Sequence, residues 1–142
     1  MSTTSPARVY ALAVGVVLVA AGIIGFFYES AFTSDESVRG AVLGILDVNG
    51  WHNVVHIATG ALGIVAARSL TGARTYCLAF GIVYLLVCVW GFIVGNDGSI
   101  LSIVPVNTAD NVLHLLLSAG GFAAYAASAP RAEAHRPSPA LS

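Results

Sequence analysis

The chain has 142 residues, of which 9% are charged and 57% are hydrophobic. A soluble globular domain carries about 25% charged residues, so this composition excludes an ordinary water-exposed surface and predicts a protein that lies in lipid. All six basic residues are arginine, the formal net charge is -1, and the arginines form no basic patch that would bind nucleic acid. The lipid bilayer is therefore the first partner that we expect.

Four stretches of the sequence contain no Asp, Glu, Lys or Arg, and each is close to the roughly 20 residues that cross the hydrocarbon layer of a membrane. They are residues 9–28, 48–67, 75–95 and 111–129. We predict one all-α domain over residues 8–129, an integral membrane four-helix bundle. Residues 1–7 and 130–142 are expected to be disordered, because their composition offers no apolar periodicity that could form a core.

The distribution of arginine predicts the orientation of these spans. Arg8, Arg68 and Arg74 fall on one side of the membrane together with the two arginines of the C-terminal tail, whereas Arg39 alone falls on the other side. Loops rich in arginine stay in the cytoplasm. We therefore expect a multi-pass protein of the bacterial inner membrane with both termini in the cytoplasm.

The sequence contains an internal repeat. Gly15 and Gly25 of the first span recur at one constant offset as Gly81 and Gly91 of the third, and His56 of the second span recurs as a histidine in the fourth. Two tandem two-helix repeats with the same orientation predict a pseudo-twofold axis along the membrane normal.

Small residues mark the expected helix contacts, because apolar side chains gain little by leaving lipid and close packing then favours small faces. We expect matched faces of the two halves to meet at these positions. The candidate packing residues are Gly15, Gly22, Gly25, Gly60, Gly63, Gly81, Gly91, Ser118 and Gly121. The apolar pieces ahead of the second and fourth spans, residues 38–46 and 100–104, are expected to lie along the outer interface as short helices.

A polar stripe follows one face of the second and fourth spans. Asn53 and His56 recur as Asn111 and His114 with the same spacing, and polar groups at that depth in a membrane mark either a partner or a function. The first interpretation is that Asn53 bonds His114 and Asn111 bonds His56, which fixes the helix packing without any cofactor.

Two cofactor hypotheses stand beside that interpretation. His52 and His56 lie one helical turn apart, and the repeat places Asp110 and His114 at the equivalent positions, so three imidazoles and a carboxylate can surround Zn²⁺ near the outer surface. Alternatively, His56 and His114 on facing helices can ligate a haem.

No nucleophile has a nearby base in this sequence, and no Gly-rich phosphate loop is present, so we expect no enzymatic activity. The first functional expectation is a structural or accessory membrane component, or a module that binds a small ligand. The alternative is a metal-binding or haem-binding component in redox chemistry or transport that uses the outer polar cluster. A homo-oligomer or a larger membrane complex is compatible with the small-residue faces.

Three segments carry a resemblance to a known family: VNGWHNVVHIATGALGI (residues 48–64), GIVYLLVCVWGF (81–92) and PVNTADNVLHLLLSAGG (105–121). They resemble the domain of unknown function 4383 family, four-helix membrane proteins found mainly in actinobacteria, over about residues 9–127. The resemblance implies the four-helix membrane fold but no activity. Ser118 departs from the glycine expected there. The residues that match the family's motif positions are Asn53, His56, Asp110, Asn111 and His114.

Overall fold

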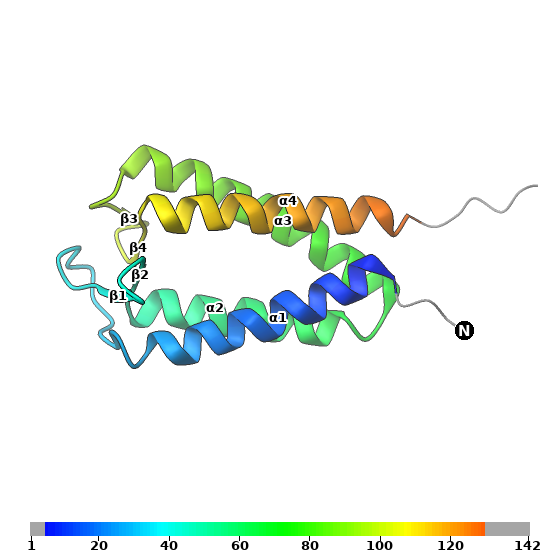
Figure 1. Cartoon of the computed structure of the whole chain (residues 1–142), viewed down its shortest axis with the longest axis horizontal. Helices are drawn as coiled ribbons and strands as arrows, with labels where there is room; N and C mark the ends of the chain where they lie inside the picture. The colour runs from blue at the N-terminus through cyan, green and yellow to red at the C-terminus, as the bar shows by residue number, and fades with distance from the viewer. Residues whose placement is uncertain (1–4, 130–142) are drawn as a thin grey trace, which may run out of the picture.

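The computed structural model describes residues 5–129, which are mostly helical, and the four predicted helices are present (Figure 1). These are α1 (Pro6–Gly25), α2 (Gly50–Ala66), α3 (Leu70–Val94) and α4 (Thr108–Ala127). Two short antiparallel hairpins connect helices at one end, and they are formed by β1 (Gly40–Val42) with β2 (Leu46–Val48) and by β3 (Ser99–Ile100) with β4 (Val104–Pro105).

Each helix begins at a side-chain cap that satisfies a free backbone N–H of the first turn. Ser5 accepts from the N–H of Arg8, and Pro6 follows it at a position where a missing N–H has no consequence. Pro6 and Ala7 were predicted to be unstructured, but they are helical, because the N–H of the buried Ala7 also donates to the hydroxyl of Ser128. The other residues of the predicted disordered termini, 1–4 and 130–142, lie outside the described residues.

The short interfacial helices predicted ahead of α2 and α4 are wrong, since both segments form β-hairpins. Their tight turns place Leu43 and Gly44, and likewise Leu101 and Ser102, at positive φ. A helix cannot accommodate two such residues in succession. Periodicity did not reveal this, because short apolar runs fit a strand as well as a helix.

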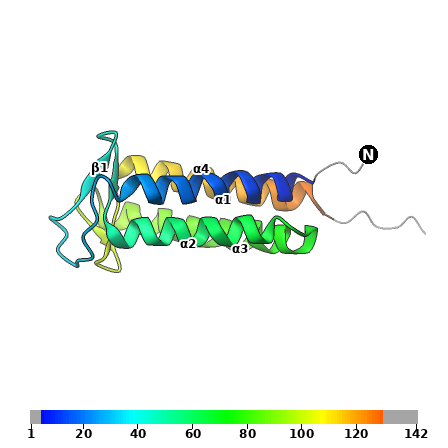
Figure 2. The same ribbon diagram turned by 90° about the horizontal axis from the view of Figure 1, so that it is seen from below.

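The four helices form two antiparallel pairs, α1 with α2 and α3 with α4 (Figure 1). Figure 2 shows that α1 and α4 lie in one layer and α2 and α3 in the other. The β-hairpins lie at one end of the bundle, called here the hairpin end, and the start of α1 and the end of α4 lie at the opposite end, called here the terminal end.

Small residues pack within each pair of helices, so the prediction that matched faces of the two halves meet there is wrong. A Cβ atom added to Gly15 would lie 2.7 Å from the carbonyl oxygen of Gly60, and one added to Gly121 would lie 2.9 Å from the carbonyl oxygen of Cys77. The two helices of a pair approach so closely that backbone contacts backbone, which only small residues permit.

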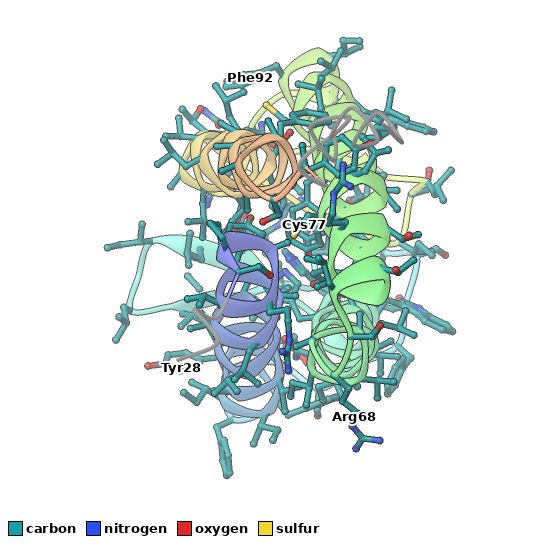
Figure 3. The ribbon with its side chains drawn as sticks, turned by 90° about the vertical axis from the view of Figure 1, so that its right-hand side faces the viewer. Tyr28, Arg68, Cys77 and Phe92 are labelled. Carbon is teal, nitrogen blue, oxygen red and sulfur yellow. The ribbon has the colours of Figure 1, made fainter. Side chains whose placement is uncertain are left out.

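The two pairs meet instead through larger side chains and through alanine. Tyr10 of α1 packs edge-on against Phe80 of α3 with ring centroids 6.2 Å apart, and Phe80 in turn stacks on Tyr84 of the same helix at 3.9 Å. Nearer the terminal end, Ala11, Ala73 and Cys77 form a second buried cluster, and Cys77 points into the bundle (Figure 3).

Two helices of the described chain, α1 and α3, are long and apolar enough to cross a membrane. Large apolar side chains also face outward from α2 and α4, for example Leu62 at 64% and Leu116 at 63% exposure. In residues 5–129 the acidic side chains lie in the loops and helix starts of the hairpin end, whereas Arg8, Arg68 and Arg74 lie at the terminal end. The long middle of the bundle carries no formal charge.

Arg39 connects the two loops of the hairpin end. Its guanidinium pairs with Asp47 at 3.2 Å and donates to the backbone carbonyls of Glu36, Asn96 and Asp97. These acceptors come from both halves of the chain, so one side chain bridges the loop after α1 and the loop after α3.

We expect Arg39→Gln to lower the free energy of unfolding by about 1–2 kcal/mol, because it removes a half-buried ion pair and several charge-assisted hydrogen bonds. Detergent-solubilised protein unfolded by a denaturing detergent and followed by circular dichroism measures this. Arg68→Gln is the matched control, since the Arg68 side chain makes no hydrogen bond within the described residues. Equal stability of the two variants would show that Arg39 does not hold the loops.

Candidate metal centre

Three histidines from two helices meet at the hairpin end of the bundle. His52 and His56 lie one turn apart on α2, and His114 lies on the facing α4. One ring nitrogen from each lies within 4.8 Å of the others, and the two Nε2 atoms of α2 are 3.2 Å apart. His52 is 2% and His114 is 4% exposed. The structure therefore brings together all three histidines that the sequence proposed for a metal site.

The protonation of His52 follows from its hydrogen bond. Its Nδ1 lies 3.1 Å from the carbonyl oxygen of Pro105, and a carbonyl can only accept, so Nδ1 carries the proton. The Nε2 lone pair of His52 then faces Nε2 of His56. Metal-binding histidines are oriented in the same way, by a second hydrogen bond from the ring nitrogen that does not bind the metal.

Asp110 lies beside the histidines but is held by backbone groups. Its Oδ2 accepts from the N–H groups of Asp47, at 3.0 Å, and Asn107, at 3.1 Å. The second bond completes a capping box at the start of α4. Asp110 lines the same cavity as the histidines, but its oxygens are not within the three-histidine group. Its first role in this structure is to fix the start of α4.

The two halves exchange equivalent hydrogen bonds around this site. Asn49, which caps α2, donates to the carbonyl of Ile103, at 2.7 Å, and Asn107, which caps α4, donates to the carbonyl of Ile45, at 2.8 Å. Each cap therefore holds the turn of the other half's β-hairpin. These crossed bonds fix the starts of α2 and α4 relative to one another, and with them the histidines of the first two turns.

The predicted bonds between asparagine and histidine are absent from the described residues. The Asn53 amide donates instead to the carbonyl of Glu29 at 2.9 Å, and its side chain packs on Gly25 of α1. Asn111 packs in the equivalent way on Gly91 of α3, and its Oδ1 has no partner within residues 5–129. Both asparagines thus act inside their own helix pair, where a glycine leaves room for the amide.

A cavity of about 100 Å³ opens between the histidines, α1 and the first β-hairpin. Aliphatic side chains form most of its wall, and His52, His56, Asp110 and His114 supply the polar atoms. Small-molecule pockets are usually about 300–1,000 Å³, so this cavity does not fit a haem. The cavity is large enough for a metal ion with a bound water molecule.

One ring nitrogen of the site is unsatisfied: the Nδ1 atom of His114 is buried without a hydrogen-bond partner within the described residues.

Two contacts of the site were not anticipated from the sequence. Tyr84 of α3 packs edge-on against the ring of His114, with centroids 5.3 Å apart, and Pro105 supplies the carbonyl that orients His52. The polarity pattern gave no signal for either. The Tyr84 position was interpreted only as a core tyrosine, and Pro105 contributes a backbone atom, which residue identity does not reveal.

The comparisons with known proteins agree with the resemblance seen in the sequence. The family described as Domain of unknown function (DUF4383) matches residues 8–127, which include all four helices nearly completely and every site residue named above. No curated protein and no solved structure matches the chain. The family carries no assigned activity, so function has to be argued from the site. The chain belongs to the DUF4383 family.

Proposed function

We propose that this chain is a non-enzymatic, four-span protein of the bacterial inner membrane, with both termini in the cytoplasm, that binds a divalent transition-metal ion near its outer face. Zn²⁺ is the first candidate. The observation that carries the metal proposal is the group of three imidazoles within 4.8 Å of one another in a small, mostly apolar cavity.

The four-span topology is supported by the outer surface of the bundle. All four helices present large apolar side chains to their surroundings, among them Val17, Leu62, Leu86 and Leu116, each more than 60% exposed. Water would oppose a surface of this kind around a whole bundle, whereas lipid accepts it. Within residues 5–129, charged groups are confined to the two ends, and those of the terminal end are all arginines, as the positive-inside rule requires of a cytoplasmic face.

Duplication of a two-helix unit is supported by contacts at equivalent positions. Gly15 packs on Gly60, and Gly81 accepts a hydrogen bond from Ser118. The Asn53 contact with Gly25, the crossed cap bonds and the paired positive-φ turns have matching partners in the other half. A pseudo-twofold axis along the membrane normal accounts for all of these. The small faces are occupied inside the chain, so the proposal does not require a second copy.

The arrangement of the three histidines suits Zn²⁺ if their ring nitrogens move slightly closer together. Tetrahedral Zn²⁺ with nitrogen at roughly 2.0–2.1 Å places neighbouring nitrogens about 3.3 Å apart. The Nε2 atoms of His52 and His56 are already 3.2 Å apart, so the widest pair needs to close by about 1.5 Å. The fourth position can be taken by water or by Asp110. Three imidazoles also suit other late transition metals.

The metal proposal is tested by adding Zn²⁺ to chelator-treated, detergent-purified protein and measuring binding by calorimetry. We expect one ion per chain and a higher melting temperature, because binding to the folded state alone stabilises it. Titration with Mg²⁺ is the control, since imidazole is a poor ligand for that ion. Absence of saturable binding of Zn²⁺, Cu²⁺ and Ni²⁺ would reject the metal centre while leaving the membrane topology standing.

We expect a cysteine placed at Ser37, in the exposed loop after α1, to react with a membrane-impermeant maleimide on intact cells. A cysteine placed at Arg68 should react only after the cells are opened, because the proposed topology puts the turn between α2 and α3 in the cytoplasm. Wild type gives the background, since Cys77 and Cys88 are buried. Labelling of both variants on intact cells, or the reverse pattern, contradicts the proposed orientation.

A further inference from the structure

We propose that the terminal end of the bundle carries a binding site for the phosphate group of an anionic phospholipid, centred on Arg74. The site is separate from the metal centre, and it rests on the proposed function only in taking the terminal end to be the cytoplasmic face of a membrane.

The site is a surface pocket of about 270 Å³ between the start of α3 and the end of α4. Arg74, Thr71 and Thr75 supply its polar groups from the first two turns of α3, and the ring of Tyr125 reaches it from α4. Leu70 and Leu78 complete the lining. The hydrogen-bond donors therefore lie together in one pocket with apolar residues around them. A phospholipid needs both, because its headgroup binds the donors and its acyl chains contact the apolar residues.

The Arg74 guanidinium is fixed in place, but its Nε has no hydrogen-bond acceptor among the described residues. Its central carbon lies 4.6 Å from the centre of the Tyr125 ring, which orients it by a cation–π contact. Its Nε is buried and has no hydrogen-bond partner within residues 5–129. A preorganised guanidinium with free donors binds phosphate oxygens in a bidentate manner.

No carboxylate lies near this end among the described residues. Arg8, Arg68 and Arg74 are all there, and the one ion pair within residues 5–129 is that of Arg39 at the other end. The positive charge of Arg74 therefore has to be compensated by an anion from outside the described residues. The hydroxyls of Thr71 and Thr75, one turn apart on the exposed face of α3, can donate to the same phosphate.

A phospholipid fits this pocket better than a free phosphate ion because of the residues around the donors. Leu70 is 42% exposed at the start of α3, and Leu78 lies two turns further toward the bundle middle. A phosphate held at Arg74 would place its acyl chains along these leucines. The cytoplasmic leaflet of bacterial membranes supplies anionic headgroups at this depth.

The test counts lipids bound to the full-length protein by native mass spectrometry in detergent doped with phosphatidylglycerol or with phosphatidylcholine. We expect wild type to retain one phosphatidylglycerol per chain and Arg74→Gln to retain about 10-fold less, because the bidentate contact is lost. Arg68→Gln is the matched control: it removes the same charge at the same end, but its side chain projects away from the bundle (Figure 3). It should change retention by less than about 2-fold.

Thr75→Val is the second variant, because it keeps the side-chain shape and leaves the contact of Arg74 with Tyr125 intact. We expect it to weaken retention of phosphatidylglycerol by about 3-fold through loss of one hydrogen bond. Equal losses in the Arg74 and Arg68 variants would overturn the site, since general surface charge would then explain binding. Equal retention of phosphatidylcholine, or equal thermal stabilisation by inorganic phosphate alone, would overturn the anionic lipid as its ligand.

Discussion

Replacing His56 by alanine is expected to lower the affinity for Zn²⁺ by at least about 100-fold. Loss of a group that merely supports a metal ligand already weakens binding by about 10–100-fold, and His56 is proposed as a ligand itself. Its Nε2 lies 3.2 Å from that of His52, so its removal leaves two imidazoles on facing helices. His114→Ala should have an effect of the same size, because it removes the imidazole that α4 contributes to the three-histidine group.

The measurement is the Zn²⁺ dissociation constant of each variant, determined by competition with a chelator of known affinity. His135→Ala is the matched control, since it removes a histidine that is not among the proposed ligands and lies outside the described residues. It should leave the tight site unchanged. If His56→Ala and His135→Ala bind Zn²⁺ equally well, the cluster is not a metal centre.

The stability of the metal-free variants separates a metal centre from a packing role. In the metal-free protein, His56 contributes one hydrogen bond to His52 within α2, and a hydrogen bond of this kind contributes about 0.5–1.5 kcal/mol. The metal-free His56 variant should therefore lose little stability, whereas Zn²⁺ should raise the melting temperature of wild type alone. A large loss of stability without any effect of Zn²⁺ would make the histidines structural.

The histidine cluster could be anticipated from the sequence because the repeat and the one-turn spacing both act through helix geometry. If α2 and α4 are helices that begin at the same height along the bundle axis, His52, His56 and His114 must lie at similar heights along that axis. The partners of Asn53 could not be anticipated in this way. Its amide reaches the carbonyl of Glu29, and which backbone group lies within reach depends on how closely α1 packs on α2.

The β-hairpins of the outer loops were missed for a related reason. Their residues are short apolar runs, and the polar groups that hold them lie far away in the sequence: the Asn107 amide donates to Ile45, and the Asp110 carboxylate accepts from Asp47. Long-range capping decides the local conformation there. Gly15 and Gly121 lie where helices approach closely, but composition cannot tell which two helices share a contact.

Exchanging the residues at one pair of repeat positions should lower the free energy of unfolding in both halves, but for different physical reasons. Gly60 and Ser118 are equivalent, but a Cβ at Gly60 would lie 2.6 Å from the carbonyl oxygen of Gly15 and 2.8 Å from the backbone nitrogen of Val19. Backbone atoms cannot move aside without separating the helices. We expect Gly60→Ser to lower the free energy of unfolding by about 1–3 kcal/mol, the usual effect of overpacking.

At the matching site the second helix pair already accommodates a serine. Ser118 is 1% exposed, and its hydroxyl donates to the carbonyl oxygen of Gly81 at 2.7 Å. Ser118→Gly removes one interhelical hydrogen bond and adds backbone freedom, each worth about 0.5–1 kcal/mol. The two effects sum to about 1–2 kcal/mol, which is the lower half of the range expected for Gly60→Ser, although both variants exchange the same two residue types.

Stability and metal affinity should change together in the Gly60 variant, because Gly60 lies one turn after His56 on α2. Forcing α1 and α2 apart at Gly60 tilts the turn that carries His56, and misplacing one imidazole weakens a site that needs all three within bonding distance. We expect Gly60→Ser to weaken Zn²⁺ binding by about 10-fold, within the range seen when the support of a ligand is lost, while Ser118→Gly leaves it nearly unchanged. Denaturant titration and chelator competition on both variants measure the two effects. If the two variants lose equal stability, the close contact of α1 with α2 does not set the helix spacing, and the positioning of His56 must depend on the caps at the hairpin end instead.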